Sequence, residues 1–447
     1  MSSRSALPPG PAAPQAVQFL GFWMRPLAYL ERCRQRYGKR FTIRLPFTPP
    51  FVMIADPEQV KEIFTAPPDV LQPGVGARVL EPVVGVNSVI LLDEPAHMEQ
   101  RKLMLPAFHG ERMERLTGLM HEVAAAEIAE LPRGTPVPLH PHMQELTLKI
   151  ILRAVFGLDP GARFDRLRQR LQEMLAFGDK PISLAPPKPD SLTARILERV
   201  GPFAEFVRIQ EDVDEILFAL IAERREAGED RDDVLSMLLA ARHEDGSPMS
   251  EQEIRDELLT LLVAGHETTA TSLAWAFERM LREPRVLDRL VNEVAGEDDA
   301  YLTATIQETL RARPVLPNVA PRYVAKPIEV GGWTYPTGCS LVANGYLIHH
   351  DPEIYPDPYA FRPERFLDEQ PGTYTWIPFG GGRRRCLGAS FALLEMKVVM
   401  RELLGACTVS AAGDGGVEMA RRRNITVRPL DGARAVLADR APVATAA

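Results

Sequence analysis

The sequence predicts a mainly helical protein with small β-sheets, in the α+β class. Segments with apolar residues at helical spacing dominate the chain, whereas strand signals are few and short. The chain has 447 residues, of which 45% are hydrophobic, enough to enclose a large core. That length alone would suggest two or three domains, yet no clean linker separates them. We therefore expect a single domain over 1–447, with flexible ends at about 1–15 and 436–447.

The strongest helix prediction covers Ser250–Arg282. Ser250 and Glu253 have the spacing of a capping box, and Glu283-Pro284 provides a stop. Between them, one face carries Ile254, Leu258, Leu261, Leu262 and Gly265. Such a helix would be about 50 Å long, so it must cross the whole body of the protein.

The remaining elements are shorter. Helices are predicted over 58–64, 97–105, 112–131 and 143–155, with two more inside 192–228. Strands are predicted over 40–45 and 51–54 as one hairpin, and over 328–330, 338–344 and 424–429.

Composition excludes some classes of function. The formal net charge of −8 argues against a nucleic-acid-binding protein, which would usually be basic. The four cysteines contain no C-x-x-C pair, which argues against a structural zinc site and suits a reducing cytoplasm. The longest early apolar run, 16–24, is far shorter than the roughly 20 residues that cross a bilayer. We expect a cytoplasmic monomer without a transmembrane segment.

The most informative segment is Phe379–Gly388, which reads F-G-G-G-R-R-R-C-L-G. Its three consecutive glycines allow a tight turn and close backbone approach to a flat ligand. Cys386 precedes a helical apolar stripe, so it is expected at a helix N-terminus, where backbone N–H groups favour a thiolate. The neighbouring arginines add positive charge. Taken alone, a cysteine is more often a small buried residue than a ligand.

The full pattern resembles a known family. Phe379, Gly382, Arg384, Cys386 and Gly388 match every fixed position of the haem-binding signature of the cytochrome P-450 family. The resemblance implies the cytochrome P-450 fold, a triangular prism around a buried haem b. It also implies that the Cys386 thiolate is the iron ligand, that Phe379 shields the sulfur and that Arg384 binds a propionate. Gly380, Gly388 and Ala264 are expected at the cofactor as well.

A second motif lies in the middle of the long helix, at 264–269, which reads A-G-H-E-T-T. Gly and Thr are poor helix formers, and Thr hydroxyls can bend a helix by bonding to the preceding turn. The small residues Ala264 and Gly265 therefore indicate either a groove or a close helix–helix contact.

This motif resembles the oxygen-activating segment of the same family. The resemblance implies that Thr268 holds bound O2 and relays protons, and that Glu267 supplies protons through water. His266 has no role in the family pattern and is expected on the solvent side or as a hydrogen-bonded core residue.

Glu308 and Arg311 have the i, i+3 spacing of an ordinary surface ion pair. The family resemblance adds Arg365 and implies a buried structural triad, whose disruption would be costly because buried charges need partners.

Further cations are expected at the haem propionates. His97 and Arg101 lie one helical turn apart and face one side. The resemblance adds Arg322 and Arg384. Each of these residues could also serve only in packing or on the surface.

Several segments are predicted to enclose a mostly apolar pocket, which indicates a hydrophobic substrate. They are Gln72–Leu92 over the haem, Leu171–Glu205 as the roof, Leu316–Ala320 beside the haem and a hairpin near Ala411–Val417. The expected lining residues are Leu259, Val263, Ala264, Leu316 and Val319. Lys180, Lys188 and Arg195 could meet a substrate carboxylate or belong to a solvated loop.

The resemblance implies a monooxygenase that inserts one oxygen atom of O2, its co-substrate, into a C–H or C=C bond of a hydrophobic small molecule. No segment for a flavin or iron–sulfur domain is visible, so a separate ferredoxin or flavodoxin with its reductase is expected. Its acidic surface would dock at Arg383 and Arg385, with Lys102, Arg112 and Arg115 nearby. A peroxygenase or isomerase, a haem-binding sensor and a protein without haem remain alternatives; Glu267 and Thr268 argue against the first.

Overall fold

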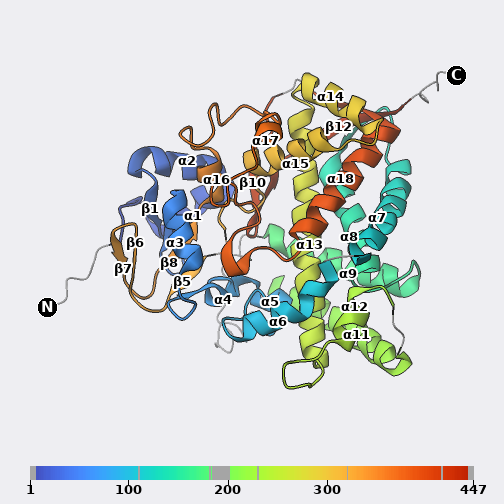
Figure 1. The fold of residues 1–447 in the computed structure, drawn as a ribbon, viewed down its shortest axis with the longest axis horizontal. Coiled ribbons are helices and arrows are strands. Elements are labelled where there is room, and N and C mark those ends of the chain that lie inside the picture. The colour runs from blue at the N-terminus through green and yellow to red at the C-terminus, as the bar shows by residue number, and fades with distance from the viewer. Residues whose placement is uncertain are drawn as a thin grey trace.

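The computed structural model describes residues 7–108, 111–180, 183, 202–228, 231–319, 321–413 and 416–440. Helices form most of this structure, and a long central helix, α13 (Glu251–Met280), runs through its middle (Figure 1). The largest sheet lies to one side of that helix (Figure 1). The predicted class, mainly helical with small sheets, is confirmed.

The N-terminal half supplies the helices on the sheet side and around the middle of α13. They are α1 (Gln15–Met24), α2 (Pro26–Tyr37), α3 (Pro57–Thr65), α4 (Pro73–Gly76), η1 (Arg78–Leu80), α5 (Glu81–Val84), α6 (Ala96–Met104), η2 (Leu105–Phe108), α7 (Glu111–Ala129), α8 (Leu139–Ala154), α9 (Ala162–Ala176), η3 (Phe177–Asp179), α11 (Pro202–Ala227) and α12 (Val234–Ala240).

The C-terminal half contributes a second set of helices, which follow α13 in the chain. These are α14 (Pro284–Val294), α15 (Ala300–Ala312), α16 (Gly345–His349), α17 (Arg365–Asp368), η5 (Gly382–Arg384) and α18 (Ala389–Ala406).

The predicted capping box starts α13. The Ser250 N–H donates to the Glu253 carboxylate at 2.8 Å, and the Glu253 N–H donates to Ser250 Oγ at 3.2 Å. Pro284 opens the next helix and ends this one within four residues of Met280. Helices α8, α15 and α18 all pack against α13. The two ends of α13 lie on opposite sides of the molecule (Figure 1).

Four small sheets complete the fold. The five-stranded sheet has the order β1 (Arg40–Ile43), β2 (Phe51–Ile54), β8 (Ser340–Ala343), β5 (Arg322–Val324), β3 (Leu71–Gln72). In it, β1 and β2 form the predicted hairpin, and β2 pairs with β8 in parallel. The others are β4 (Pro136–Pro138) with β12 (Arg434–Asp439) and β9 (Cys407–Ala411), β6 (Ile328–Val330) with β7 (Trp333–Tyr335), and β10 (Ala420–Arg423) with β11 (Thr426–Pro429).

Two hydrophobic clusters hold these layers together. The larger one joins α7, α8, α9, α11, α13, α15 and α18. The smaller one joins the five-stranded sheet to α2 and α3. Several residues from Val319 to Ala343, between α15 and α16, belong to the second cluster. The segment that carries the cysteine motif follows them in the chain.

Some expectations differ from the structure. Helix α9 was not predicted from the sequence, and 72–92 contains short helices in place of a plain loop. The hairpin expected near 411–417 is wrong, because Ala411 ends β9, which pairs with β12. Both ends expected to be flexible carry ordered contacts: the Thr42 N–H donates to the Pro9 carbonyl at 3.0 Å, and Val436–Asp439 pair with β9. None of the described helices combines the length and apolar composition needed to cross a membrane.

Candidate active site

The cysteine motif forms a turn that enters α18. Gly380 and Gly382 have φ values of 68° and 63°, a region that favours glycine. The Cys386 N–H donates to the Phe379 carbonyl at 2.9 Å and closes the turn. Helix α18 begins three residues later, with Gly388 as its N-cap. The sequence therefore places Cys386 just before a helix N-terminus, as expected.

Two glycines of the motif serve a contact within the protein. A Cβ at Gly381 would lie 2.5 Å from the ring of Phe64, and a Cβ at Gly382 would lie 2.6 Å from the Phe64 carbonyl oxygen. These glycines let the turn pack against the end of α3. The sequence had instead suggested that they allow close approach of the backbone to a flat ligand. Gly388 differs, because a Cβ there would meet no protein atom within 4 Å.

Cys386 is exposed, in contrast to the other three cysteines, which are buried. The protein around it raises the pKa of its thiol by desolvation, although the Gly388 N–H and the guanidiniums of Arg101 and Arg385 favour the thiolate. Desolvation and these donors therefore act in opposite directions on the Cys386 thiol. A metal bound to the sulfur would supply the missing stabilisation.

The four predicted propionate donors converge from three separate segments: α6, β5 and η5. Burial and the charges of Arg384 and Arg101 keep the pKa of His97 below its ordinary value. Burial and the nearby Arg384 lower the pKa of Arg322 to about 10. Burial also lowers the pKa of Arg384 to about 10, and Arg101 acts in the same direction. These cations therefore crowd one another beside Cys386.

Among the described residues, the carboxylates close to this cluster of cations are those of Asp93 and Glu94. Arg384 lies 3.5 Å from Asp93 and donates to the carbonyls of Val89 and Leu92. His97 Nδ1 is hydrogen-bonded to Glu94 at 2.9 Å. Crowded, partly desolvated guanidiniums are stabilised by additional anions.

These residues fit a haem. An exposed sulfur, open space at Gly388 and a group of cations that favours extra carboxylates match the iron and the two propionates. Cys386 would hold the iron, and His97, Arg101, Arg322 and Arg384 would hold the propionates. Phe379 lies half-buried with its ring 5.9 Å from that of Trp376. No cluster of three metal-binding side chains occurs in the described residues.

The middle of α13 is open on one face. Most of this helix is buried, yet Ala264 is exposed and Val263 and Thr268 are half-buried. Thr268 Oγ1 donates to the Ala264 carbonyl, as expected for a Thr that bends a helix. On the opposite side, Gly265 contacts α8, where a Cβ would lie 3.0 Å from Ile151. The close helix contact, one of the two expected alternatives, is therefore present at Gly265.

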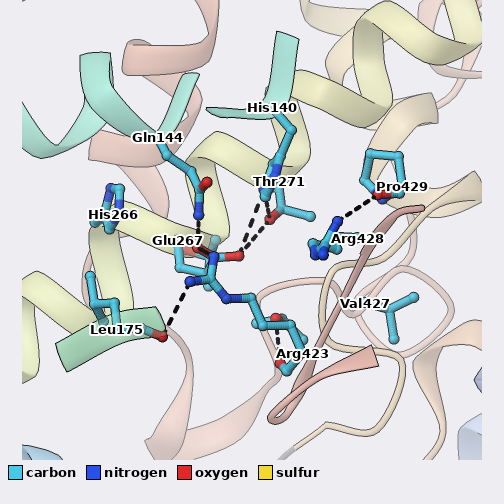
Figure 2. Close-up of polar contacts among 12 residues, drawn as sticks. His140, Gln144, Leu175, His266, Glu267, Thr271, Arg423, Val427, Arg428 and Pro429 are labelled. Atoms are coloured by element: carbon cyan, nitrogen blue, oxygen red, sulfur yellow. Dashed lines mark hydrogen bonds and ion pairs between the residues drawn. The ribbon is translucent and has the colours of Figure 1, made fainter. Parts of the chain in front are cut away.

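Glu267 points into a buried polar network (Figure 2). It accepts hydrogen bonds from Gln144 at 2.6 Å, Arg423 at 2.7 Å and Thr271 at 3.2 Å. Burial disfavours its charge, but His140 and Arg423 outweigh this and hold the pKa of Glu267 well below its usual range. Glu267 is therefore ionised, and its hydrogen bonds lead toward α8 and β10.

His266 is a core residue, one of the two expected positions. It is 3% exposed, and its Nδ1 lies 2.8 Å from Thr147 Oγ1 on α8. Burial lowers the pKa of His266 to about 4, so it is neutral and supports the contact of α13 with α8.

The structure brings the three residues of the predicted triad together. Arg311 donates to Glu308 at 2.6 and 2.8 Å, and Arg365 Nε lies 3.5 Å from the same carboxylate. Glu308 and Arg311 are fully buried. Arg311 also donates to the His349 and Pro358 carbonyls, which ties α15 to the segment before α17.

The predicted pocket residues divide into two groups. Val263, Ala264 and Leu316 are partly or fully exposed, as a lining residue would be. Leu259 is fully buried in the large core, so it does not open onto the space beside Ala264. Val319 belongs to the sheet-side core, and its side chain would lie 3.5 Å from a Cβ at Gly380, beside the cysteine turn.

Parts of the roof lie outside the described residues, including Lys188 and Arg195, and so does Ala320. Lys180 lies 3.7 Å from Glu205 and 5.7 Å from the ring centre of Phe177. It is exposed and already paired, as in a solvated loop.

Several buried polar residues near the middle of α13 were not predicted from the sequence. His140, Gln144 and Arg423 surround Glu267, and Glu395 is fully buried on α18. A run of three arginines at 421–423 was a signal for an acidic partner, but the partner lies 156 residues away in the chain. Pairing at that distance depends on the tertiary fold.

An exposed cysteine before a helix, a cluster of cations and a partly exposed stretch of the central helix are features that a haem-thiolate oxygenase requires. Comparisons with known proteins agree. The family model described as "Cytochrome P450" matches residues 7–433. A Mycobacterium tuberculosis protein named "Putative cytochrome P450 135B1" is 39% identical over 441 residues, covering 97% of this chain and 92% of that protein. Another from the same organism, "Putative cytochrome P450 138", is 38% identical over 437 residues, covering 96% of each.

A solved structure described as "Retinoic acid bound cyanobacterial CYP120A1" has a TM-score of 0.83 at 24% identity, covering 98% of this chain and all of that one. The chain belongs to the cytochrome P450 family, whose members are haem-thiolate monooxygenases.

Proposed function

We propose that this protein inserts one oxygen atom of O2 into a C–H or C=C bond of a hydrophobic small molecule. The observation that carries the proposal is the position of Cys386, exposed beside the cation cluster of His97, Arg101, Arg322 and Arg384. When haem is bound, thiolate ligation favours O–O cleavage. The protein contributes the position of the substrate and control of protons.

Thr268 is the residue proposed to act on bound O2. Its hydroxyl bonds the Ala264 carbonyl, so it lies on the open face of α13 with a fixed orientation. A hydroxyl in that state can still accept a hydrogen bond, and it can donate its own hydrogen once it leaves the carbonyl. Glu267 is the proposed acid behind it, after release from its present partners.

The proposed substrate is hydrophobic because the side chains on the open face are apolar. Val263, Ala264 and Leu316 are aliphatic and at least partly exposed. Such surfaces bind ligands mainly by burial of apolar area, with few polar contacts for orientation.

Electrons are proposed to come from a separate ferredoxin or flavodoxin with its reductase. Arg383 and Arg385 are exposed in the cysteine turn. Lys102 is paired with Glu244 at 2.8 Å and Arg115 with Asp232 at 3.2 Å, so these two contribute less net charge. The side chain of Arg112 lies outside the described part.

The docking site can be tested by charge reversal. Arg385→Glu is expected to slow reduction by a ferredoxin several-fold at low salt, and Lys102→Glu is expected to slow it less. The dependence of the rate on ionic strength should weaken in Arg385→Glu. Equal effects of the two changes would exclude a site centred on the cysteine turn.

The reaction itself can be tested with isotopic oxygen. Hydrophobic compounds are first screened for a high-spin shift of the Soret band on binding. Each binder is then incubated with the protein, NADPH, a ferredoxin–reductase pair and ¹⁸O2. A product that carries one ¹⁸O atom supports the proposal. Product formed only from added peroxide would instead identify a peroxygenase, and rearranged product without added oxygen an isomerase.

A further inference from the structure

Two adjacent carboxyl groups, those of Asp256 and Glu257, lie buried near the start of α13. Neither side chain is exposed to solvent. Asp256 is paired with Arg255 at 2.9 Å, whereas no cation pairs with Glu257 among the described residues. Burying an ionisable group without a counter-charge lowers the stability of a fold, so Glu257 is expected to do more than fill space.

The hydrogen-bond partner of Glu257 is the backbone of the segment predicted to lie over the haem. The Val89 N–H donates to Glu257 Oε1 at 2.8 Å. Burial raises the pKa of Glu257 to about 8, although this bond and the nearby Gln100 of α6 favour the charged form. Near neutral pH, Glu257 therefore keeps its proton and accepts the Val89 bond as an uncharged carboxyl group.

The two residues before Val89 bind the same part of α13. The N–H and the side-chain amide of Asn87 donate to Asp256 Oδ2 at 3.0 and 2.9 Å. The hydroxyls of Ser88 and Thr260 lie 2.7 Å apart. Gly85 has a φ of 82°, and a Cβ there would lie 2.1 Å from Asp256 Oδ1, so only glycine allows this close approach. Three consecutive loop residues are thus fixed to α13.

The same loop also contacts the cation cluster. The Val89 carbonyl accepts a hydrogen bond from Arg384 Nη1 at 3.2 Å, and the Leu92 carbonyl accepts one from Nη2. A guanidinium has five N–H donors, so these two bonds leave others for a bound carboxylate. Val89 therefore connects Glu257 to Arg384 through a single residue, with its N–H bonded to the first and its carbonyl to the second.

We propose that Glu257 is a positioning residue for haem binding, because it fixes Val89 and Val89 in turn fixes the direction in which Arg384 presents its guanidinium to the propionates. Arginine has a long side chain that loses much conformational entropy when it binds a ligand. A guanidinium that is already oriented loses less, so the ligand binds more tightly. The inference rests on the proposed place of Arg384 at the propionates, whereas the dependence of the loop on Glu257 can be measured separately.

Two variants of Glu257 separate the hydrogen bond from the shape of the side chain. Glu257→Ala removes the acceptor for Val89. Glu257→Gln keeps a carbonyl oxygen and the size of an uncharged carboxyl group, so it should restore the properties of the unmodified protein. The matched control is Glu278→Ala, which also removes a buried carboxyl group from α13. Glu278 lies near the other end of the helix, paired with Arg279 and Arg282.

The first measurement is hydrogen exchange of the holoprotein, followed by mass spectrometry. Glu257→Ala is expected to speed exchange across residues 85–93 by about threefold to tenfold, the range for loss of one hydrogen bond. Glu257→Gln and Glu278→Ala should stay within about twofold of the unmodified protein. Unchanged exchange in Glu257→Ala would show that the loop does not depend on this carboxyl group, which overturns the proposal.

The second measurement is a double-mutant cycle on haem transfer to apomyoglobin. Glu257→Ala alone is expected to speed transfer by about threefold to tenfold. In an Arg384→Ala background it should add less than about twofold, because the guanidinium that it orients is gone. Arg322→Ala removes a cluster cation on another element, β5, and in that background the full effect should remain. An equal effect of Glu257→Ala in both backgrounds would overturn the proposal.

A spectroscopic signature separates positioning from a general loss of stability. The propionate bending modes in the resonance Raman spectrum should shift in Glu257→Ala, return in Glu257→Gln and stay unshifted in Glu278→Ala. If Glu257→Ala fails to fold, Glu257→Leu fills the space without accepting a hydrogen bond and carries all three measurements. The expected exchange, transfer and Raman results without ¹⁸O in any product would overturn only the proposed function.

Discussion

Arg311 donates two hydrogen bonds to Glu308, one turn earlier on α15, and both side chains are fully buried. Arg365, the first residue of α17, approaches the same carboxylate. Glu308, Arg311 and the partly exposed Arg365 hold one another in place, because removal of any one leaves the others without a full set of partners.

Glu308→Gln should therefore be strongly destabilising. We expect a loss of roughly 3–5 kcal/mol in the free energy of unfolding, since two guanidiniums lose their counter-charge in the core. Chemical denaturation of the holoprotein measures it. The control is Glu353→Gln, which breaks the exposed ion pair with Lys39 and should cost under about 1 kcal/mol. Similar losses in both variants would show that the triad is not a stabilising unit.

Cys386→Ser should abolish thiolate ligation of haem. The reduced, carbon-monoxide-bound protein is expected to lose its strongly red-shifted Soret band, because that band requires a thiolate ligand. Cys339→Ala provides the control, since Cys339 is buried in the sheet-side core away from the cysteine turn. A red-shifted band that survives in Cys386→Ser would remove the basis of the assignment.

Arg384→Ala should weaken haem retention. The variant removes a guanidinium from the cation cluster together with its bonds to the carbonyls of Val89 and Leu92. We expect haem transfer to apomyoglobin to become at least about tenfold faster, corresponding to roughly 1.4 kcal/mol. Arg383→Ala, an exposed neighbour, should transfer haem at the original rate. Identical rates for both variants would place the propionates elsewhere.

Thr268→Val should uncouple oxygen consumption from product formation. Valine keeps the shape of the side chain but removes the hydroxyl proposed to act on bound O2. We expect peroxide release to rise and product per NADPH to fall several-fold, while the substrate-induced Soret shift remains. Ser272→Ala removes a hydroxyl that bonds the Thr268 carbonyl one turn later, and it should retain normal coupling. Unchanged coupling in Thr268→Val would assign proton control to another group.

Glu395 should make stability depend on pH. Burial raises the pKa of this fully buried carboxyl from 4.5 to about 8. The folded protein therefore keeps the proton at pH values where the unfolded chain has lost it. Stability should fall as pH rises from about 4.5 to about 8, by up to about 1.4 kcal/mol per unit, and level off above. Melting curves of Glu395→Gln should lose this part of the slope, and an unaltered slope would contradict the raised pKa.

Much of the fold could be predicted from short-range sequence patterns. Ser250 and Glu253 marked the start of α13 because a capping box needs only neighbouring residues. The β1–β2 hairpin was predictable for the same reason. Helix α9 was missed because its sequence, A-R-F-D-R-L-R-Q-R-L-Q-E-M-L-A, is rich in charge and its apolar stripe is narrow.

The site was predictable where a fixed spacing defines it. The turn before Cys386 and the pair of Glu308 with Arg311 are short-range patterns. The polar partners of Glu267 were not predictable, because His140 lies far before it in the sequence and Arg423 lies far after it. The close packing of Gly381 against Phe64 was also not predicted, because Phe64 lies on a helix far earlier in the sequence.

The parallel pairing of β2 with β8 has a consequence for how the protein is made. Residues 51–54 pair with residues 340–343, which are synthesised much later. During synthesis, one edge of the early hairpin therefore stays unpaired until most of the polypeptide has left the ribosome. Folding of this region is expected to be a late, post-synthetic event that is exposed to aggregation, and co-expressed chaperones should raise the yield of folded product.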